Sequence, residues 1–417
     1  MKSTHNAGHP VLSQIVSLIP RDIVDQVVAE YQSDYYYKYM TTHKHLVFML
    51  YGVISRSRSL RGLCNSILFL ENKLSYLQID KAPCLSTFSD ANKNRSSDVF
   101  GQLYYRLYQH YKGYLNTNYL KAFLSEVDPS QVEVFDSTTI SLFTDIFKNA
   151  GTPAADGSKK GGIKVNVKTS LASTVPNIVL MDHASTSEKK FIGQLSAQEN
   201  KIYVFDKGYA SFWKWREMME KGAHFLTMAN ENIQATVLTE QPSPVLDHET
   251  GEVVQDARVM IGKTLKGGPF EARMITYKEG PNKPPVRFIT SLFELDVMTV
   301  VRLYKCRWSI EVLFKSLKQN FELYHFYSDS PEGIKTQIWV ALIANLIFRV
   351  IHKMVNGAKS FTSVVIMASL NLCSYDSLIY KIKSMTKQYV EEGLSSVQLD
   401  LFGNKQGVLS EIREKSP

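Results

Sequence analysis

Residues 304–318 read YKCRWSIEVLFKSLK, and the spacing of their side chains predicts an amphipathic helix. Four polar residues lie three, four and seven positions apart: Tyr304, Arg307, Glu311 and Lys318. At about 100° per residue they fall within roughly 60° of one another around a helix axis. The adjoining sector is apolar and contains Leu303, Cys306, Ile310, Leu313, Phe314, Leu317 and Phe321. One flank therefore packs into a core, while the next presents a single carboxylate beside a phenol and two cations.

Two interpretations of this polar flank stay open on these residues alone. Glu and Lys on the solvated face of a helix commonly form weak surface ion pairs. A lone carboxylate between cations also suits a divalent metal ion held next to phosphate groups. The second interpretation needs further carboxylates from elsewhere in the chain.

The charge balance favours a polyanionic partner. The formal net charge is +8 over 417 residues, and the excess is uneven: residues 1–125 hold fourteen Lys or Arg against eight Asp or Glu. A basic face of this kind is typical of nucleic-acid binding. Basic proteins without a nucleic-acid role are also common, so the charge does not identify the partner by itself.

The cysteines and the apolar stretches indicate a reducing, cytoplasmic setting without a membrane partner. None of the four cysteines has the close spacing of a zinc site or suggests a disulfide framework. The first residues, MKSTHNAGHPVLSQ, contain no apolar core and predict no signal peptide. The longest apolar stretch, IWVALIANLIFRV, is too short to span a bilayer and includes Asn345 and Arg349, which predicts a buried helix.

The first part of the chain, residues 1–125, is predicted to be helical, because apolar residues recur three and four positions apart. Within it, CLSTFSDANKNRSS predicts a short helix that Ser86 could cap, with Lys93 and Arg95 at its end. Helices joined by short turns and carrying a basic surplus fit a DNA-reading bundle. They fit an ordinary bundle with a solvated basic face equally well. Lys93 and Arg95 are candidate DNA contacts under the first alternative.

From about residue 131 the pattern changes to a mixed α/β sheet with helices packed on it. Short runs rich in Val, Ile, Phe and Tyr predict strands, and SEKKFIGQLSAQ and ASFWKWREMMEKG predict helices between them. Pro and Gly punctuate residues 230–290, where RVMIGK, EARMITYK and VRFITSL predict a β-rich insertion. Asp296 is placed to cap the helix that carries Glu311. Further helices and a polar tail are expected over residues 356–417.

Two aspartates lie within or at the end of apolar runs and could complete a cluster with Glu311. Asp136 is inside VEVFDSTTISL, and Asp206 directly follows the run IYVF. An ionised side chain is costly in such a place unless it is paired or binds a metal ion. Each Asp alone could be a turn or cap residue at a strand end. Three neighbouring carboxylates would repel one another, and Mg²⁺ relieves such repulsion.

With these residues in place, the chain resembles the DDE transposases of bacterial insertion sequences, in the group of the insertion sequence 4 type marked by a Tyr-Arg-Glu-Lys signature. All signature spacings are kept at residues 304–318, and FDSTTI around Asp136 and FDKGY around Asp206 resemble the two Asp motifs. The carboxylates are separated by 70 and 105 residues, and the long second gap matches an insertion before the last one. One departure is Lys207, where the motif more typically has Arg. Lys keeps the positive charge but cannot bind a phosphate through two parallel hydrogen bonds.

The resemblance implies an RNase H-like catalytic core over residues 126–355, preceded by an all-helical DNA-end-binding domain over residues 1–125. It implies that Asp136, Asp206 and Glu311 bind two Mg²⁺ ions, with Mn²⁺ as a substitute. Phosphate contacts are implied for Tyr304, Arg307 and Lys318, with support from Lys207. Trp308 either stacks on a displaced base or is buried.

The expected function is cut-and-paste transposition. The enzyme would bind the terminal inverted repeats of its element, cleave the ends and join the 3′-hydroxyls to target DNA. The expected partners are double-stranded DNA and a second copy of the chain, in a nucleoid-associated complex. Two alternatives are an inactive DNA-binding descendant and a glycosidase with paired carboxylates. The cationic neighbours of Glu311 disfavour the glycosidase.

Overall fold

The computed structural model describes residues 8–116, 124, 126–141, 152–153, 159–160, 162–173, 175–230, 232–241, 252–263, 267–280, 282–356 and 359–391. The chain divides into two compact units. The first combines residues 1–111 with 316–417, and the second is residues 112–315. The division into domains 1–125, 126–355 and 356–417 stays a prediction.

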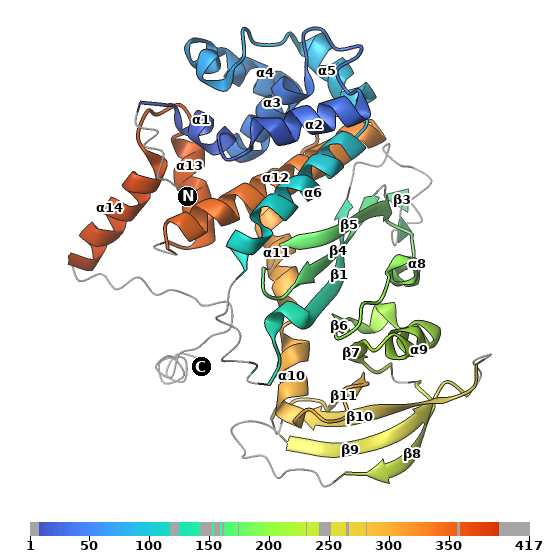
Figure 1. The fold of residues 1–417 in the computed structure, drawn as a ribbon. Helices are drawn as coiled ribbons and strands as arrows, with labels where there is room; N and C mark the ends of the chain where they lie inside the picture. The colour runs from blue at the N-terminus through green and yellow to red at the C-terminus, as the bar shows by residue number, and fades with distance from the viewer. Residues whose placement is uncertain are drawn as a thin grey trace. The chain divides into compact units, whose positions relative to one another are not determined.

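The described part of the first unit is built from helices (Figure 1). Three of them, α3, α5 and α13, pack on the long helix α12. Pro20 separates the first two helices, since its ring fixes an extended backbone before the next helix begins. The bounds are α1 Val11–Val16, α2 Arg21–Tyr31, α3 Thr42–Ser55, α4 Leu60–Leu68, η1 Glu71–Leu77, α5 Leu85–Asn94, α6 Asp98–Leu115, α12 Pro331–Met354, α13 Phe361–Leu370 and α14 Leu378–Glu391.

Helix starts in this unit follow ordinary capping chemistry. The Ser330 hydroxyl accepts a hydrogen bond from the Gly333 N–H, and Pro331 occupies the first helical position of α12. Helix α5 differs from the prediction. Its N-cap is Cys84, which makes no side-chain cap hydrogen bond, so Ser86 lies inside the first turn.

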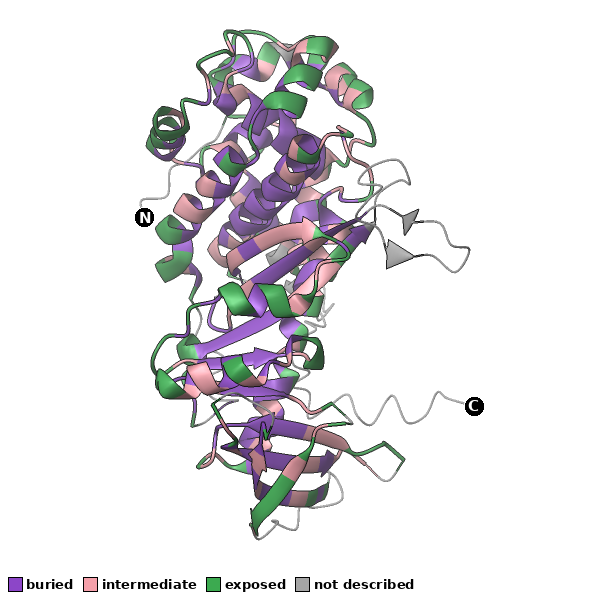
Figure 2. Ribbon diagram, turned by 90° about the vertical axis from the view of Figure 1, so that its right-hand side faces the viewer, coloured by how far each residue is buried: buried purple, intermediate pink, exposed green. Residues whose placement is uncertain are grey.

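Helix α12 is longer than the apolar stretch from which it was predicted. By length and composition its 24 residues could cross a membrane, whereas the apolar stretch within it is shorter. The prediction of a buried helix is confirmed. In the structure, 89% of its most apolar window is buried against other parts of the protein, and the ribbon coloured by burial shows α12 mostly in the buried colour (Figure 2). The core helix of a soluble protein passes the same test of length and composition.

The second unit contains a nine-stranded mixed sheet in the order β5-β4-β1-β6-β7-β11-β10-β9-β8. Strands β1, β6 and β7 are parallel neighbours, and the remaining pairings are antiparallel. The insertion predicted for residues 230–290 adds β8 to β11 to the edge of this sheet. The bounds are β1 Val132–Ser141, β4 Gly162–Ser170, β5 Pro176–His183, β6 Ile202–Phe205, β7 His224–Met228, β8 Ala235–Glu240, β9 Glu252–Ile261, β10 Phe270–Lys278 and β11 Val286–Thr290; β2 Thr152–Pro153 and β3 Lys159–Lys160 pair separately.

Helices cover both faces of this sheet (Figure 1). Helices α8 (Glu188–Gln194) and α9 (Phe212–Glu220) pack on one face over an aromatic core. There the Trp215 ring stacks on Phe225 with ring centroids 4.9 Å apart. Helix α10 (Val297–Lys305) contacts β6 and β7 from the other face. Because side chains alternate along a strand, Phe135 points toward α8 while Asp136 points the other way.

The signature residues lie on two consecutive helices, whereas the sequence predicted one. Helix α10 ends at Lys305, and α11 (Trp308–Asn320) begins three residues later. Across the junction the N–H of Arg307 bonds to the carbonyl of Tyr304, three residues back, and the next turns repeat this tighter pattern. Asp296 therefore caps α10, where its carboxylate accepts from the N–H groups of Met298 and Thr299.

Candidate active site

The two aspartates are brought together by the parallel pairing of β1 and β6. Phe135 of β1 is the register partner of Phe205 of β6, so the next residue on each strand is the Asp. Asp136 and Asp206 therefore lie side by side on neighbouring strands. The backbone alone explains why residues 70 positions apart meet.

Arg307 connects Asp136 to Glu311. Its Nη1 donates to Asp136 Oδ2 at 2.8 Å, and its Nη2 donates to Glu311 Oε1 at 2.6 Å. The Asp136 and Arg307 side chains are 15% and 17% exposed, whereas Glu311 is 43% exposed. One guanidinium thus bridges two of the three predicted carboxylates in a partly desolvated position.

Tyr304 connects the same cluster to Asp206. Its hydroxyl donates to Asp206 Oδ1 at 3.3 Å, and its ring packs on Phe288 of β11. The Arg307 guanidinium lies 5.7 Å from the centre of the Tyr304 ring. Asp136, Glu311 and Tyr304 therefore contact Arg307 directly, and Asp206 is linked to it through Tyr304.

The electrostatics of the cluster reflect crowding of negative charge. The pKa of Asp136 is raised to about 6, mainly by burial and to a smaller extent by the carboxylates of Glu311 and Asp206, while the Ser137 N–H and Arg307 lower it. Burial would lower the pKa of Arg307, but the facing carboxylates of Asp136 and Glu311 reverse that effect and raise it. Burial also raises the pKa of Tyr304. The Arg307 guanidinium supplies the positive charge between the Asp136 and Glu311 carboxylates.

A buried ion pair orients the segment that leads into α10. Arg273 on β10 donates two hydrogen bonds to Asp256 on β9, at 2.9 and 2.7 Å, and both side chains are at most 4% exposed. The same guanidinium donates to three backbone carbonyls, those of Leu292, Phe293 and Leu295. The insertion strands thus fix the loop that ends at the α10 N-cap.

Lys318 and Lys207 are the remaining candidates for phosphate contacts near the signature, and they lie on helix α11 and on the turn after β6. Lys318 is on α11, seven residues after Glu311 and so on the same face, and burial lowers its pKa. Lys207 opens the turn η4 (Lys207–Tyr209) and is exposed. Trp308 is 58% exposed, which removes the alternative of buried packing.

The two candidates in the first unit differ from each other. Lys93 is exposed near the end of α5, where a phosphate could reach it. Arg95 is 2% exposed, and its guanidinium donates to the Met40 carbonyl and contacts His45 Nδ1. The Arg95 side chain therefore has no exposed edge for DNA, because it ties α5 to the loop before α3.

The acidic side chains of the cluster do not converge on a single point. Across the part of the chain that the structure describes, no three His, Cys, Asp or Glu side chains are gathered so that they could hold a metal ion as they stand. The reason lies in the cluster: Arg307 holds Asp136 and Glu311 on its two amino groups. The donor type fits Mg²⁺, since all three groups are carboxylates whose charges already interact.

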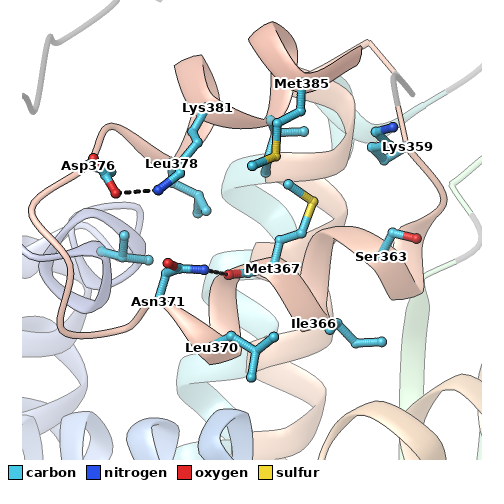
Figure 3. A pocket seen from close by; sticks show the side chains of 12 residues that line it. Lys359, Ser363, Ile366, Met367, Leu370, Asn371, Asp376, Leu378, Lys381 and Met385 are labelled. Carbon is cyan, nitrogen blue, oxygen red and sulfur yellow. Dashed lines mark hydrogen bonds and ion pairs between the residues drawn. The ribbon is translucent and has the colours of Figure 1, made fainter. Parts of the chain in front are cut away.

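A cavity of about 420 Å³ in the first unit has a different character (Figure 3). It lies between α13 and α14 and is lined mainly by apolar side chains such as Ile366, Met367 and Leu378. Asp376 and Lys381 at its edge form an ion pair with each other. It offers no carboxylate cluster and is not part of the candidate site.

One neighbour of the cluster was not predicted from the sequence. Glu188, the first residue of α8, accepts a hydrogen bond from the hydroxyl of Ser137, the residue after Asp136. In the sequence an acid at the start of a helix is ordinary, because it stabilises the helix dipole. Nothing in the local pattern distinguishes Glu188 from such a residue.

Comparison with known proteins identifies the family of the chain. The family model described as the transposase DDE domain matches residues 128–347, which is more than half of the chain and includes all three carboxylates. This chain belongs to the DDE transposase family. A second model, a domain of unknown function (DUF4372), matches residues 7–78. The resemblance to insertion-sequence transposases is thereby confirmed.

Curated relatives of the DDE transposase carry transposase names. The chain is 25% identical over 243 residues to transposase y4zB of Sinorhizobium fredii, 22% identical over 241 residues to a transposase named for the insertion sequence IS5377 of Geobacillus stearothermophilus, and 24% identical over 273 residues to one named for IS4SA of Synechocystis. The matches cover 57%, 57% and 64% of this chain. They span 66%, 62% and 71% of the relatives, so the chain matches about two thirds of their length.

Proposed function

We propose that this DDE transposase is the enzyme of an insertion sequence, that it binds the terminal inverted repeats of its element and that it transfers them by cut-and-paste transposition. The observation that carries the proposal is the connected cluster of Asp136, Asp206, Glu311, Tyr304 and Arg307. In this cluster three acids lie beside the side chains that we propose to bind phosphate, next to the parallel pairing of β1 and β6. An RNase H-like core belongs to the same proposal, supported by three antiparallel strands followed by two parallel ones.

The carboxylates of Asp136, Asp206 and Glu311 would hold the divalent metal ions that this family generally uses. When bound, such ions activate a water molecule or a 3′-hydroxyl and stabilise the charge that develops on a phosphodiester. The burial of Asp136 makes its interaction with a cation stronger than it would be in water. Two Mg²⁺ ions, with Mn²⁺ as a substitute, remain part of the proposal.

Tyr304, Arg307, Lys318 and Lys207 would hold backbone phosphates of the transposon end. Arg307 suits this role because its planar guanidinium can bind a phosphate through two parallel hydrogen bonds. Exposed Trp308 is placed to stack on a base that leaves the duplex. Lys93 would contribute a phosphate contact from the first unit.

We further propose that two copies of the chain cleave paired DNA ends together. This complex would assemble on the nucleoid in the cytoplasm. The alternative is a transposase-derived protein that binds DNA without cutting it. The acid cluster favours the enzyme, because a protein that only binds DNA gains nothing from three acids close to phosphate.

The test is a labelled duplex that carries the terminal repeat from the DNA flanking the gene, incubated with the intact chain in Mg²⁺ and in EDTA. Mg²⁺-dependent cuts at the repeat end support the enzyme. Tight binding with no cut in either Mg²⁺ or Mn²⁺, on single and paired ends alike, supports the DNA-binding alternative.

A further inference from the structure

Glu188 lies against both Asp motifs at once. Its Oε1 accepts from the Ser137 hydroxyl at 3.1 Å, next to Asp136. Its Oε2 lies beside Gly208, two residues after Asp206: a Cβ added at Gly208 would stand 2.0 Å from this oxygen. The two motifs come from different parts of the chain, and Glu188 contacts a residue that follows each of them.

The Glu188 carboxylate is fixed in place by its surroundings. Lys164 on β4 forms an ion pair with Oε1 at 3.6 Å and also donates to the Thr186 carbonyl, just before α8. Helix α8 itself packs on the η4 turn, with the Phe191 ring against the buried ring of Tyr209. The carboxylate thus has two polar partners, Ser137 and Lys164, and stands on a helix that packs against the η4 turn.

This contact explains the glycine in the second Asp motif. The three atoms nearest to a Cβ at Gly208 all belong to Glu188, at 2.0, 3.2 and 3.9 Å. With Gly208 at this position, the Glu188 carboxylate lies where a larger side chain would stand. A larger residue at position 208 would push against Oε2 of this carboxylate, whose other oxygen contacts Ser137 and Lys164.

We propose that Glu188 is a positioning residue that fixes the Asp136 motif relative to the Asp206 motif. A helix-dipole role alone would require neither the Ser137 hydrogen bond nor the contact with Gly208. A partner that orients metal-binding side chains typically changes metal affinity by about tenfold to a hundredfold when it is removed. The proposal rests on the function proposed above, since it assumes that the aspartates bind metal.

The experiment measures Mn²⁺ affinity of the intact chain by titration calorimetry, without DNA. Four variants are compared: Glu188→Ala, Glu188→Gln, Gly208→Ala and the double variant Glu188→Ala with Gly208→Ala. Circular dichroism and the unfolding midpoint check that each is folded.

We expect Glu188→Ala to weaken Mn²⁺ binding about tenfold or more. Glu188→Gln should stay within about threefold of the unaltered chain, because its amide oxygen still accepts from Ser137. Gly208→Ala should weaken binding as Glu188→Ala does. The double variant should be no worse than either single one, since the collision disappears with the carboxylate.

Unchanged affinity in Glu188→Ala, or losses that add in the double variant, would overturn the positioning role. If Glu188→Ala does not fold, Gly208→Ala and Glu188→Gln decide the question: equal, unchanged affinity in both overturns it. Asp136→Ala separates this failure from failure of the function. If Asp136→Ala also binds Mn²⁺ normally, the metal site is misassigned, whereas loss in Asp136→Ala alone contradicts only the role of Glu188.

Discussion

The Arg307 guanidinium lies 2.8 Å from the Asp136 carboxylate, although 171 residues separate the two in the sequence. The same guanidinium holds Glu311, so it occupies oxygens that a metal ion would need. Arg307 is thus an internal counter-ion of Asp136 and Glu311.

Replacing this counter-ion should strengthen metal binding. In Arg307→Gln the facing carboxylates lose one positive charge, and at an effective dielectric constant near 20 a charge about 4 Å away is worth several kcal/mol. We expect Mn²⁺ to bind about tenfold more tightly in calorimetry without DNA. Cleavage should nevertheless fall, because the phosphate contact is lost.

The matched control is Lys305→Gln, two residues earlier. Its ammonium pairs with Glu279 at 2.7 Å and not with the acid cluster. The control should leave Mn²⁺ affinity unchanged. Equal or weaker Mn²⁺ binding in Arg307→Gln would show that Arg307 does not compete with metal.

Arg95 should contribute to stability and not to DNA binding. Arg95→Ala removes a buried guanidinium that donates to the Met40 carbonyl at 2.6 Å and pairs with Asp34, which keeps its hydrogen bonds from Thr42. We expect a loss of about 3 kcal/mol in urea unfolding. Lys93→Ala, on the exposed side of the same helix end, should change stability by less than about 0.5 kcal/mol and should weaken DNA binding. The reverse pattern would restore Arg95 as a DNA contact.

The buried Arg273–Asp256 pair should be needed for the acid cluster to form. Asp256→Ala leaves a guanidinium buried without its carboxylate, and we expect a loss of about 3–5 kcal/mol in unfolding free energy together with weaker Mn²⁺ binding. Arg258→Ala is the control on the same strand. Its side chain is 37% exposed and pairs with Glu271, so its loss should stay below about 1 kcal/mol. Similar losses in both variants would argue against a special role for the buried pair.

Two cysteines should differ sharply in reactivity. Hydrogen bonds from the hydroxyls of Ser86 and Thr87 lower the pKa of Cys84 to about 7, whereas burial raises the pKa of Cys306 to about 12. Since the thiolate is the nucleophile, Cys84 should be alkylated increasingly fast as the pH rises through about 7. Peptide mass spectrometry after iodoacetamide treatment at several pH values measures this. A midpoint for Cys84 near the ordinary value of a thiol, or early labelling of Cys306, would contradict the structure.

Local sequence patterns predicted the elements that local chemistry determines. The strands that carry Asp136 and Asp206 are runs of apolar residues, and the capping by Asp296 follows from its side chain. The break after Lys305 was missed because the helical spacing continues across it, and tertiary contacts of Tyr304 and Arg307 accompany the tighter turn. Strand β8, with mostly exposed residues, has no apolar run that would mark it.

The partners of the charged residues could not be predicted for a related reason. Lys93 and Arg95 are both basic residues at the end of the same predicted helix. Lys93 is exposed, whereas Arg95 is buried and donates to the Met40 carbonyl. The contacts of Glu188 with Ser137 and Gly208 cross 51 and 20 residues and depend on how α8 packs on the sheet. Such relationships belong to tertiary structure and leave no periodic trace.

The most direct test of the account compares cleavage and binding of the terminal-repeat duplex by Asp136→Ala, Asp206→Ala and Glu311→Ala. Lys315→Ala, exposed one turn after Glu311, is the control. The account predicts that each acid variant still shifts the duplex in a gel but makes no cut in Mg²⁺, while Lys315→Ala cuts as the unaltered chain does. Normal Mg²⁺-dependent cutting by any of the three acid variants would contradict the central claim that these carboxylates form the catalytic site.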